Sequence, residues 1–404
     1  GYTLQIGENS VPSQGRRPKD HERGIPMRIQ TFKLERQFAL YKAKAKYMLS
    51  QTSCEGCSMQ EILDMADAEC RQLWENLSLG YTKPEGFLPL REAISARYTS
   101  IRPSDILELA PEEGIFIFMN NMLEPGDEVI VMHPTLPSLY ELPRALGCTV
   151  IKWPLEVTSS GWRLDVNFLV ENSSPKTKLL IMNIPNNPTG FIPVRAELDR
   201  ILNIADRNGT WIFNEETYRG MEHDPGAALP SLADIYPRAT VVGGLNKYGL
   251  PGTRIGWLAT KNRQILNDCA AFKDYTTLCN NAPGEVLATI AMRNAPDLLK
   301  RNHDIVLENL AIAESFFRKH RDLFQWIQPN GGATAFPRLL PPYDVTEMCE
   351  RAMAEKQLLI RGGRAFGLET NHFRVGLGRL DFKGALAVFA ELADEVKAAA
   401  TGED

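Results

Sequence analysis

Long apolar runs are missing from this 404-residue sequence. No run approaches the roughly 18 apolar residues of a membrane-spanning helix, which argues against an integral membrane protein. An excess of charge of one sign is also missing: the net charge is −5 over the whole chain, which argues against a nucleic-acid-binding surface. Internal repeats and low-complexity linkers are absent. With 44% hydrophobic and 24% charged residues, the chain has the composition of a globular protein and is long enough for two domains.

Cysteine is scarce as well. The seven cysteines are an odd number in a long chain, which favours free thiols in a reducing compartment, and hence the cytoplasm, over a disulfide framework. Cys54 and Cys57 have the Cys-x-x-Cys spacing of a redox pair or of half a zinc site. No second such pair or histidine pair follows at metal-site spacing, and no thioredoxin-like strand precedes them. We therefore expect two packed thiols and no bound metal.

The first 26 residues are polar and lack the apolar core of a secretory signal. Basic residues cluster there, but the acidic Glu8, Asp20 and Glu22 disfavour a mitochondrial presequence. Met27 is a plausible alternative start. We expect residues 1–26 to form a polar N-terminal arm.

Strands and helices alternate along the middle of the chain. Apolar runs that predict strands lie in residues 128–134, 148–155, 178–190 and 210–220. Such alternation predicts a doubly wound, mostly parallel sheet, and ligands of such sheets bind at the carboxyl ends of the strands. The polar residues at predicted strand ends are Asn187, Glu215, Tyr218 and Lys247.

The two ends of the chain predict a second, smaller α/β domain. Residues 32–50 have apolar positions at helical spacing, and residues 58–76 predict one helix that begins with a Ser58–Glu61 capping box. Further helices are predicted over residues 262–273, 282–293 and 301–320, the last as a link between the domains. The strands predicted for the smaller domain lie in residues 326–340, 357–361 and 372–376.

The most informative stretch is VVGGLNKYGLPGTRIGW, from Val241 to Trp257. A β-branched run ends in two glycines before Lys247, so this lysine leaves a strand end and is expected to be partly desolvated. Desolvation lowers the pKa of an amine and frees it to attack a carbonyl. Arg254, seven positions later, can hold a phosphate as a two-pronged donor. The alternative is a surface lysine and arginine around an ordinary turn, but an imine-forming amine beside a phosphate-binding arginine fits pyridoxal phosphate (PLP).

This stretch resembles the lysine motif of fold type I, class I/II aminotransferases, S-x-S-K-x-x-x-x-x-G-x-R-x-G. The matching residues are Lys247, Gly252, Arg254 and Gly256. Gly244 and Asn246 stand in place of the two serines. The resemblance implies that Lys247 carries the cofactor as an imine and then moves protons as general base and acid, while Arg254 contacts the phosphate.

Other segments resemble further motifs of the family, in the family's order. YTKPEGFLPLR gives Tyr81, the tyrosine that reaches across a dimer interface to the neighbour's cofactor phosphate. IPNNPTG gives Asn187, and NEETYR gives Tyr218; the resemblance implies that both bind the cofactor's phenolate oxygen. Glu215 stands where the family has an aspartate facing the pyridine nitrogen, with Asn214 as the alternative if the register slips by one. FRVGLG gives Arg374, which together with Asn187 is implied to bind the substrate.

Several positions depart from the family. Ala110-Pro111 replaces the usual glycine-alanine pair at a helix start, so the amides of Glu112 and Glu113 must bind the phosphate there. Their carboxylates would repel a phosphate if they turned inward. Leu136 occupies the position of the aromatic residue that stacks on the cofactor ring in the family. Such changes are typical of a divergent member.

We therefore predict an α/β protein with the aminotransferase-like fold type I: a doubly wound, mostly parallel sheet in a large domain plus a small α/β domain. The expected limits are residues 1–26 for the arm, 27–74 and 296–404 for the small domain, and 75–295 for the PLP-binding domain. The resemblance implies a homodimer that acts on an L-amino acid or amino-acid conjugate. The net charge and the lack of long apolar runs argue against a nucleic-acid or membrane partner.

The predicted reaction is transamination, since most relatives carry it out. The alternative is elimination or replacement at the β- or γ-carbon, as in carbon–sulfur lyases and cyclopropane-forming synthases of the same fold. A PLP-binding regulator without catalysis is a third reading. Such regulators fuse this fold to a winged-helix module, for which the sequence before residue 30 has no room.

Overall fold

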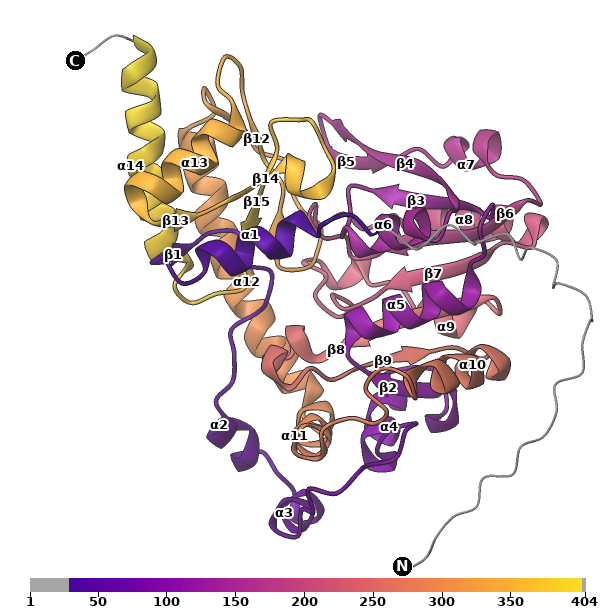
Figure 1. Ribbon diagram of the computed structural model, residues 1–404. Coiled ribbons are helices and arrows are strands. Elements are labelled where there is room, and N and C mark those ends of the chain that lie inside the picture. The colour runs from indigo at the N-terminus through magenta and orange to yellow at the C-terminus, as the bar shows by residue number, and fades with distance from the viewer. Residues whose placement is uncertain (1–28, 402–404) are drawn as a thin grey trace, which may run out of the picture.

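The computed structural model describes residues 29–401, so the expectation for the arm of residues 1–26 falls outside the described residues. One large sheet with its covering helices forms most of the molecule, and a group of short strands and helices lies at one end of it (Figure 1). The long helix α12 (Ala295–Lys319) runs between the two. Within residues 29–401, no helix has both the length and the apolar character needed to cross a membrane.

The large sheet has eight strands, and most of its neighbouring strands are parallel. The strands in spatial order are β2 (Ile106–Leu109), β9 (Gly256–Ala259), β8 (Ala239–Gly244), β7 (Trp211–Glu215), β6 (Thr177–Asn183), β3 (Glu128–His133), β4 (Thr149–Thr158) and β5 (Gly161–Leu164). β9 and β5 run opposite to the other six strands, so the pairs β2–β9, β9–β8 and β4–β5 are antiparallel. The predicted mostly parallel sheet is therefore confirmed.

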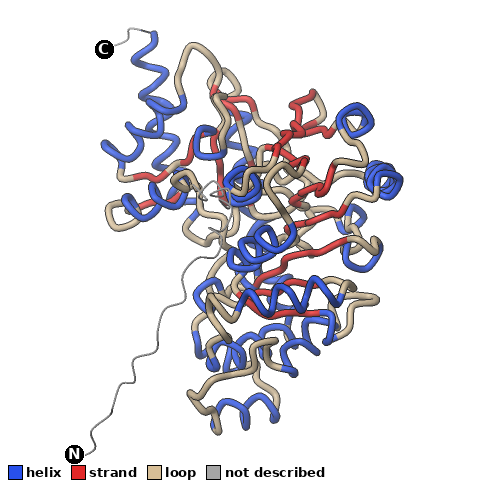
Figure 2. The backbone as a smooth tube through the Cα atoms, turned by 45° about the vertical axis from the view of Figure 1, so that its right-hand side comes forward, coloured by secondary structure: helices blue, strands red, loops and turns tan. Residues whose placement is uncertain are grey.

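Apolar side chains on both faces of this sheet are buried. Ile212 and Val241 belong to one apolar cluster, whereas their neighbours Phe213 and Val242 belong to another, because successive strand residues point to opposite faces. Figure 2 shows helices on both sides of the strands. The helices of this part are α4 (Leu88–Ser95), α5 (Pro111–Met122), α6 (Ser138–Ala145), α7 (Asn167–Asn172), α8 (Arg195–Asn208), α9 (Leu232–Ile235), α10 (Arg263–Lys273) and α11 (Ala282–Arg293).

The smaller part combines residues from both ends of the chain. One parallel pair joins β1 (Tyr47–Met48) to β13 (Leu358–Leu359). The remaining strands are β10 (Phe324–Gln325) with β12 (Arg338–Leu339), and β11 (Thr334–Ala335), β15 (Phe373–Gly376) and β14 (Arg361–Gly362). The helices are α1 (Lys33–Tyr41), α13 (Val345–Lys356) and α14 (Phe382–Thr401).

Some predicted boundaries are wrong. The helix predicted over residues 58–76 is two helices, α2 (Met59–Asp64) and α3 (Ala68–Glu75), because the Asp67 side chain accepts from Cys70 N and starts a second helix. The Ser58–Glu61 capping box is confirmed. The helix predicted over residues 32–50 ends at Tyr41, because residues 47–48 pair with a distant strand instead.

Two further predictions for the chain's C-terminal third need correction. The linking helix begins at Ala295, before the predicted residue 301. The strand predicted over residues 326–340 is broken into short pieces, because Gly331 and Gly332 form a turn that pairs with residues 221–223 of the large part.

Candidate active site

Lys247 lies in a one-turn helix, residues 245–247, directly after the carboxyl end of β8. Its side chain is buried, and its amine donates a hydrogen bond to the carbonyl oxygen of Thr52 at 2.7 Å. Burial lowers the pKa of the Lys247 amine to about 8, against the opposing effect of the nearby Cys54 and Glu215. The expected desolvation of this lysine is confirmed, and a substantial neutral fraction is available for nucleophilic attack near pH 8.

Tyr218 lies next to this amine. The Lys247 Nζ atom is 4.1 Å from the centre of the Tyr218 ring, and the Tyr218 hydroxyl donates to the same Thr52 carbonyl at 2.9 Å. Burial raises the pKa of the Tyr218 phenol, so it is a neutral donor at physiological pH. Tyr218 and Lys247 were both predicted as site residues and are 29 positions apart in the sequence. Their side chains therefore meet at one carbonyl oxygen of the N-terminal segment, that of Thr52.

Glu215 is the last residue of β7. It is buried, and it is close enough to Lys247 for its charge to act on the Lys247 amine. Its carboxylate accepts from Asn183 Nδ2 at 2.5 Å and from the Thr217 amide at 2.8 Å. Burial raises its pKa, which the Thr217 hydrogen bonds and the Lys247 charge partly oppose. A cationic partner such as a protonated pyridine nitrogen would act against this rise and favour the charged carboxylate.

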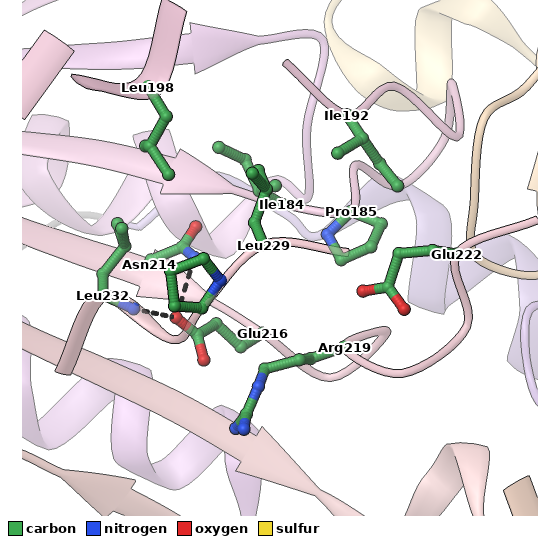
Figure 3. Close-up of a pocket in the computed structure, with 11 residues that line it drawn as sticks. Ile184, Pro185, Ile192, Leu198, Asn214, Glu216, Arg219, Glu222, Leu229 and Leu232 are labelled. Carbon is green, nitrogen blue, oxygen red and sulfur yellow. Dashed lines mark hydrogen bonds between the residues drawn. The ribbon is translucent and has the colours of Figure 1, made fainter. Parts of the chain in front are cut away.

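The neighbouring Asn214 points elsewhere. Its amide donates to Glu216 Oε1 at 3.2 Å, and both residues line a small cavity with Ile184 and Leu198 (Figure 3). Alternation along β7 thus places Asn214 and Glu215 on opposite faces of the sheet. The one-residue register slip that would make Asn214 the cofactor's partner does not fit this geometry.

Asn187 and Arg374 meet across the two parts of the molecule. Arg374 lies on β15, donates from Nη1 to Asn187 Oδ1 at 3.3 Å, and donates from Nε to the Ser50 carbonyl at 3.0 Å. Its guanidinium is buried over the Phe366 ring, and burial lowers its pKa to about 10, so it remains a cation at neutral pH. None of these contacts is with a carboxylate, so the charge of the buried guanidinium is not paired by them. Such a guanidinium suits an anionic ligand.

The start of α5 lies directly beside the strand end that leads to Lys247. A Cβ atom on Gly244 or on Gly256 would be 2.7 Å from Pro111 Cγ, so the proline ring fills the space beside both glycines. Arg254 is exposed in a left-handed conformation (φ 56°), and its Nη1 atom donates to the Pro251 carbonyl at 3.3 Å. Glu112 is the second residue of α5; desolvation raises the pKa of its carboxyl, and the Arg254 guanidinium is close enough to act against that rise.

Two further predicted positions, Tyr81 and Leu136, make no side-chain hydrogen bond or ring contact with these residues within residues 29–401. Tyr81 is 90% exposed and lines a cavity of about 540 Å³ with Leu77, Phe87 and Val286. Leu136 is half-buried two residues before α6, and it packs against the apolar cluster that contains residues of α5. Tyr140, four positions on, is buried against His133.

Sequence reasoning missed several residues of this cluster. Thr52 and Ser50 take part through backbone carbonyls, which carry no side-chain signal. Asn183 carried a weak signal, as a polar residue that ends the apolar strand KLLIMN. Cys54 was noted only for its spacing to Cys57; burial raises the pKa of its thiol to about 11, and the Lys247 charge acts against that rise.

Comparison with known proteins identifies the family. The family model for aminotransferases of class I and II matches residues 62–381. The chain belongs to this family. Capreomycidine synthase from Streptomyces vinaceus is 30% identical over 317 residues, which cover 75% of this chain and 78% of that protein.

Solved structures agree with this class I/II aminotransferase assignment. A PLP-dependent aminotransferase from Streptococcus suis superposes with a TM-score of 0.85 at 27% identity, over 91% of this chain and 99% of that one. A PLP-dependent cyclase superposes with a TM-score of 0.82 at 25% identity, over 95% of this chain and all of that one. The predicted fold type I and the predicted PLP dependence are confirmed.

The residues present fit PLP at the ring end of the site. A buried amine of lowered pKa, a buried carboxyl and a phenol converge at the carboxyl ends of β7 and β8. At the phosphate end, Pro111 and Glu112 occupy the first turn of α5, and the buried Ser138 hydroxyl has no hydrogen-bond partner at standard geometry within residues 29–401. The cofactor, when bound, supplies an electron sink that makes the α-proton of an amino acid acidic.

Proposed function

We propose that this PLP-dependent enzyme transfers the amino group of an L-amino acid or amino-acid conjugate to a 2-oxo acid, with Lys247 as the proton carrier. The observation that carries the proposal is the meeting of the Lys247 amine and the Tyr218 hydroxyl at one carbonyl oxygen, beside the buried Glu215. An amine with a pKa of about 8 is suited to take up and return a proton near neutral pH.

The proposed roles of the other residues follow from their charges. Glu215 holds a proton on the pyridine nitrogen, because a buried carboxylate stabilises a cation beside it. Asn187 and Tyr218 hydrogen-bond the phenolate oxygen, and Arg374 binds the substrate α-carboxylate through its two-pronged guanidinium. Arg254 and the start of α5, including Glu112, bind the phosphate.

A second candidate reaction is elimination, replacement or cyclisation at the β- or γ-carbon. Two relatives favour it, one named as a synthase and one as a cyclase. The departures of this chain at Gly244, Asn246 and Leu136 also support it, since they alter the surroundings of the cofactor and not the proton carrier. Both reactions begin with removal of the α-proton by Lys247, and they diverge only afterwards.

The assembly we propose is a cytoplasmic homodimer in which Tyr81 reaches the neighbouring subunit's phosphate site. Its 90% exposure, next to the exposed Leu79, supports an interface at this surface. All seven cysteines are free, which supports a reducing compartment. We also propose residues 75–295 as the cofactor-binding domain, with residues 27–74 and 296–404 forming the smaller one.

Incubation with a panel of L-amino acids, with and without 2-oxoglutarate, tests the reaction. Transamination predicts product only when the 2-oxo acid is present, as glutamate together with the 2-oxo acid of the donor. Elimination or cyclisation predicts turnover without any 2-oxo acid. Turnover of no amino acid by the cofactor-loaded protein, with no change of its visible absorbance, would contradict both.

A further inference from the structure

Two adjacent carboxylates begin α5, and their surroundings differ. Glu113 turns away from the site: its Oε1 atom accepts from the hydroxyls of Thr276 at 2.6 Å and Thr277 at 2.7 Å, and its Oε2 atom accepts from the Ala110 amide at 3.3 Å. Glu112 keeps exposed surface and lies near the buried hydroxyl of Ser138. Only Glu112 is therefore available to a ligand at this end of the helix.

The first turn of α5 is deficient as an anion site. Pro111 has no N–H group, so the helix offers one donor fewer than usual at its start. The proline ring is packed against Gly244 and Gly256, which fixes this turn beside the strand end that leads to Lys247. Arg254 and Ser138 both act on the Glu112 carboxyl, so a phosphate held between this turn and Arg254 would lie close to that carboxyl.

Charged groups from several elements act on the Glu112 carboxyl. Desolvation is the main cause that raises its pKa to about 7; the charges of Glu215 on β7 and Glu35 on α1 add to the rise. The Ser138 hydroxyl on α6 and the guanidinium of Arg254 lower the pKa. On balance these effects favour the neutral form of the Glu112 carboxyl more than in an ordinary glutamate.

We propose that Glu112 meets the cofactor phosphate as a neutral carboxylic acid, and that its O–H donates to a phosphate oxygen in place of the N–H that Pro111 lacks. An ionised carboxylate would repel the phosphate, which carries about −1.5 to −2 charges at pH 7. Above neutral pH, loading of the cofactor therefore takes up a proton at Glu112. This inference rests on the cofactor of the family and not on which reaction follows.

The test measures the dissociation constant of PLP for the cofactor-free protein between about pH 6 and pH 9, by equilibrium dialysis. For Glu112→Gln, which cannot ionise, we expect the wild-type-to-variant ratio of Kd to be constant below pH 7. Above pH 7 this ratio should rise by up to about tenfold per pH unit, because wild type must take up one proton when it binds PLP and the variant does not. The titration of Lys247 affects both proteins and cancels in the ratio.

Two controls locate the effect. Glu113→Gln should give a ratio that does not change with pH, because Glu113 faces Thr276 and Thr277 instead of the phosphate. Pyridoxal, which lacks the phosphate, should show no pH-dependent ratio for Glu112→Gln. If Glu112→Gln unfolds by circular dichroism, Glu112→Ser removes the same charge and should give the same rise.

A ratio that stays constant across the pH range would overturn the proposal, since Glu112 would then not change ionisation on loading. An equal rise with pyridoxal would overturn it too, because the effect would come from the ring end of the site. Neither result depends on an amino-acid substrate. Failure here is thus distinct from failure of the proposed transamination.

Discussion

At the scale of single residues, the proposed chemistry depends first on the Lys247 amine. The amine is protonated below its pKa of about 8 and neutral above it. Since only the neutral amine attacks an aldehyde, the rate at which the cofactor-free protein captures PLP should rise about tenfold per pH unit below pH 8 and level off above. Stopped-flow absorbance measures this rate.

Borohydride reduction of the loaded protein identifies the lysine. Peptide mapping should find the reduced adduct on Lys247, and Lys247→Ala should lose essentially all turnover because no other side chain replaces a positioned proton carrier. The second buried lysine, Lys273, donates to the Pro84 carbonyl and is the natural control. An adduct on Lys273 would show that the assignment is wrong.

Glu215 is the residue whose charge should matter most after Lys247. Glu215→Gln removes the charge at nearly constant size, so the pyridine nitrogen loses its anionic partner and kcat should fall about a hundredfold, or roughly 2.7 kcal/mol. Asn214→Ala changes a residue on the opposite face of β7. This variant should have a lower melting temperature but a kcat close to that of wild type. Full activity of Glu215→Gln would contradict the proposed role.

Arg374 should act on substrate binding and not on the cofactor. Arg374→Lys keeps the cation but loses the two-pronged geometry, so KM for an amino acid should rise at least about tenfold while the cofactor's visible spectrum is unchanged. An amine without a carboxylate should react equally with both proteins. If such an amine reacts with wild type as well as the amino acid does, Arg374 does not bind the carboxylate.

At the scale of elements, the turn at residues 329–332 holds the Tyr218 ring in place. Both ring nitrogens of His223 contact carbonyls of this turn, Pro329 O at 3.2 Å and Gly332 O at 2.9 Å. Gly332 has φ 73°, and a Cβ atom there would lie 3.1 Å from the Tyr218 ring. The turn thus couples the smaller part of the molecule to a predicted cofactor-binding residue.

Gly332→Ala should therefore displace Tyr218 and lower kcat, in addition to the cost of about 1 kcal/mol for a left-handed alanine. Gly209→Ala is the matched control, because Gly209 has φ 68° and a Cβ atom added there would have no neighbouring atom within 4 Å among the described residues. Both variants should lose stability by thermal denaturation, but only Gly332→Ala should lose kcat. Equal kcat losses would mean that the contact with Tyr218 is unimportant.

At the scale of the whole molecule, exposed apolar side chains gather near Tyr81. Leu79 is 81% exposed and Tyr275 is 91% exposed, and their segments are joined by a hydrogen bond from Thr82 to the Asn280 carbonyl. Leu79→Asp should shift the proposed dimer toward monomer and reduce activity, as measured by analytical ultracentrifugation and assay. Val170→Asp changes another exposed apolar residue, on the distant helix α7, and should leave the dimer intact.

The sequence by itself determined the motif residues, the alternation of strands and helices, and the capping box at Ser58, because each depends on neighbours within a few positions. Local pattern also placed Glu215 and Lys247 at strand ends and predicted the desolvation of that lysine. The break at Asp67 was missed although it too is a local capping signal.

Only the tertiary structure decided which groups meet. Thr52 contributes a backbone carbonyl from 195 positions away from Lys247, and no local pattern marks a carbonyl for such a role. The end of α1 and the pairing of β1 with β13 depend on a strand more than 300 residues away, which competes with local helical spacing. The different surroundings of Glu112 and Glu113 likewise depend on Ser138, Thr276 and Thr277, because long-range packing and not sequence spacing brings these side chains next to each carboxyl.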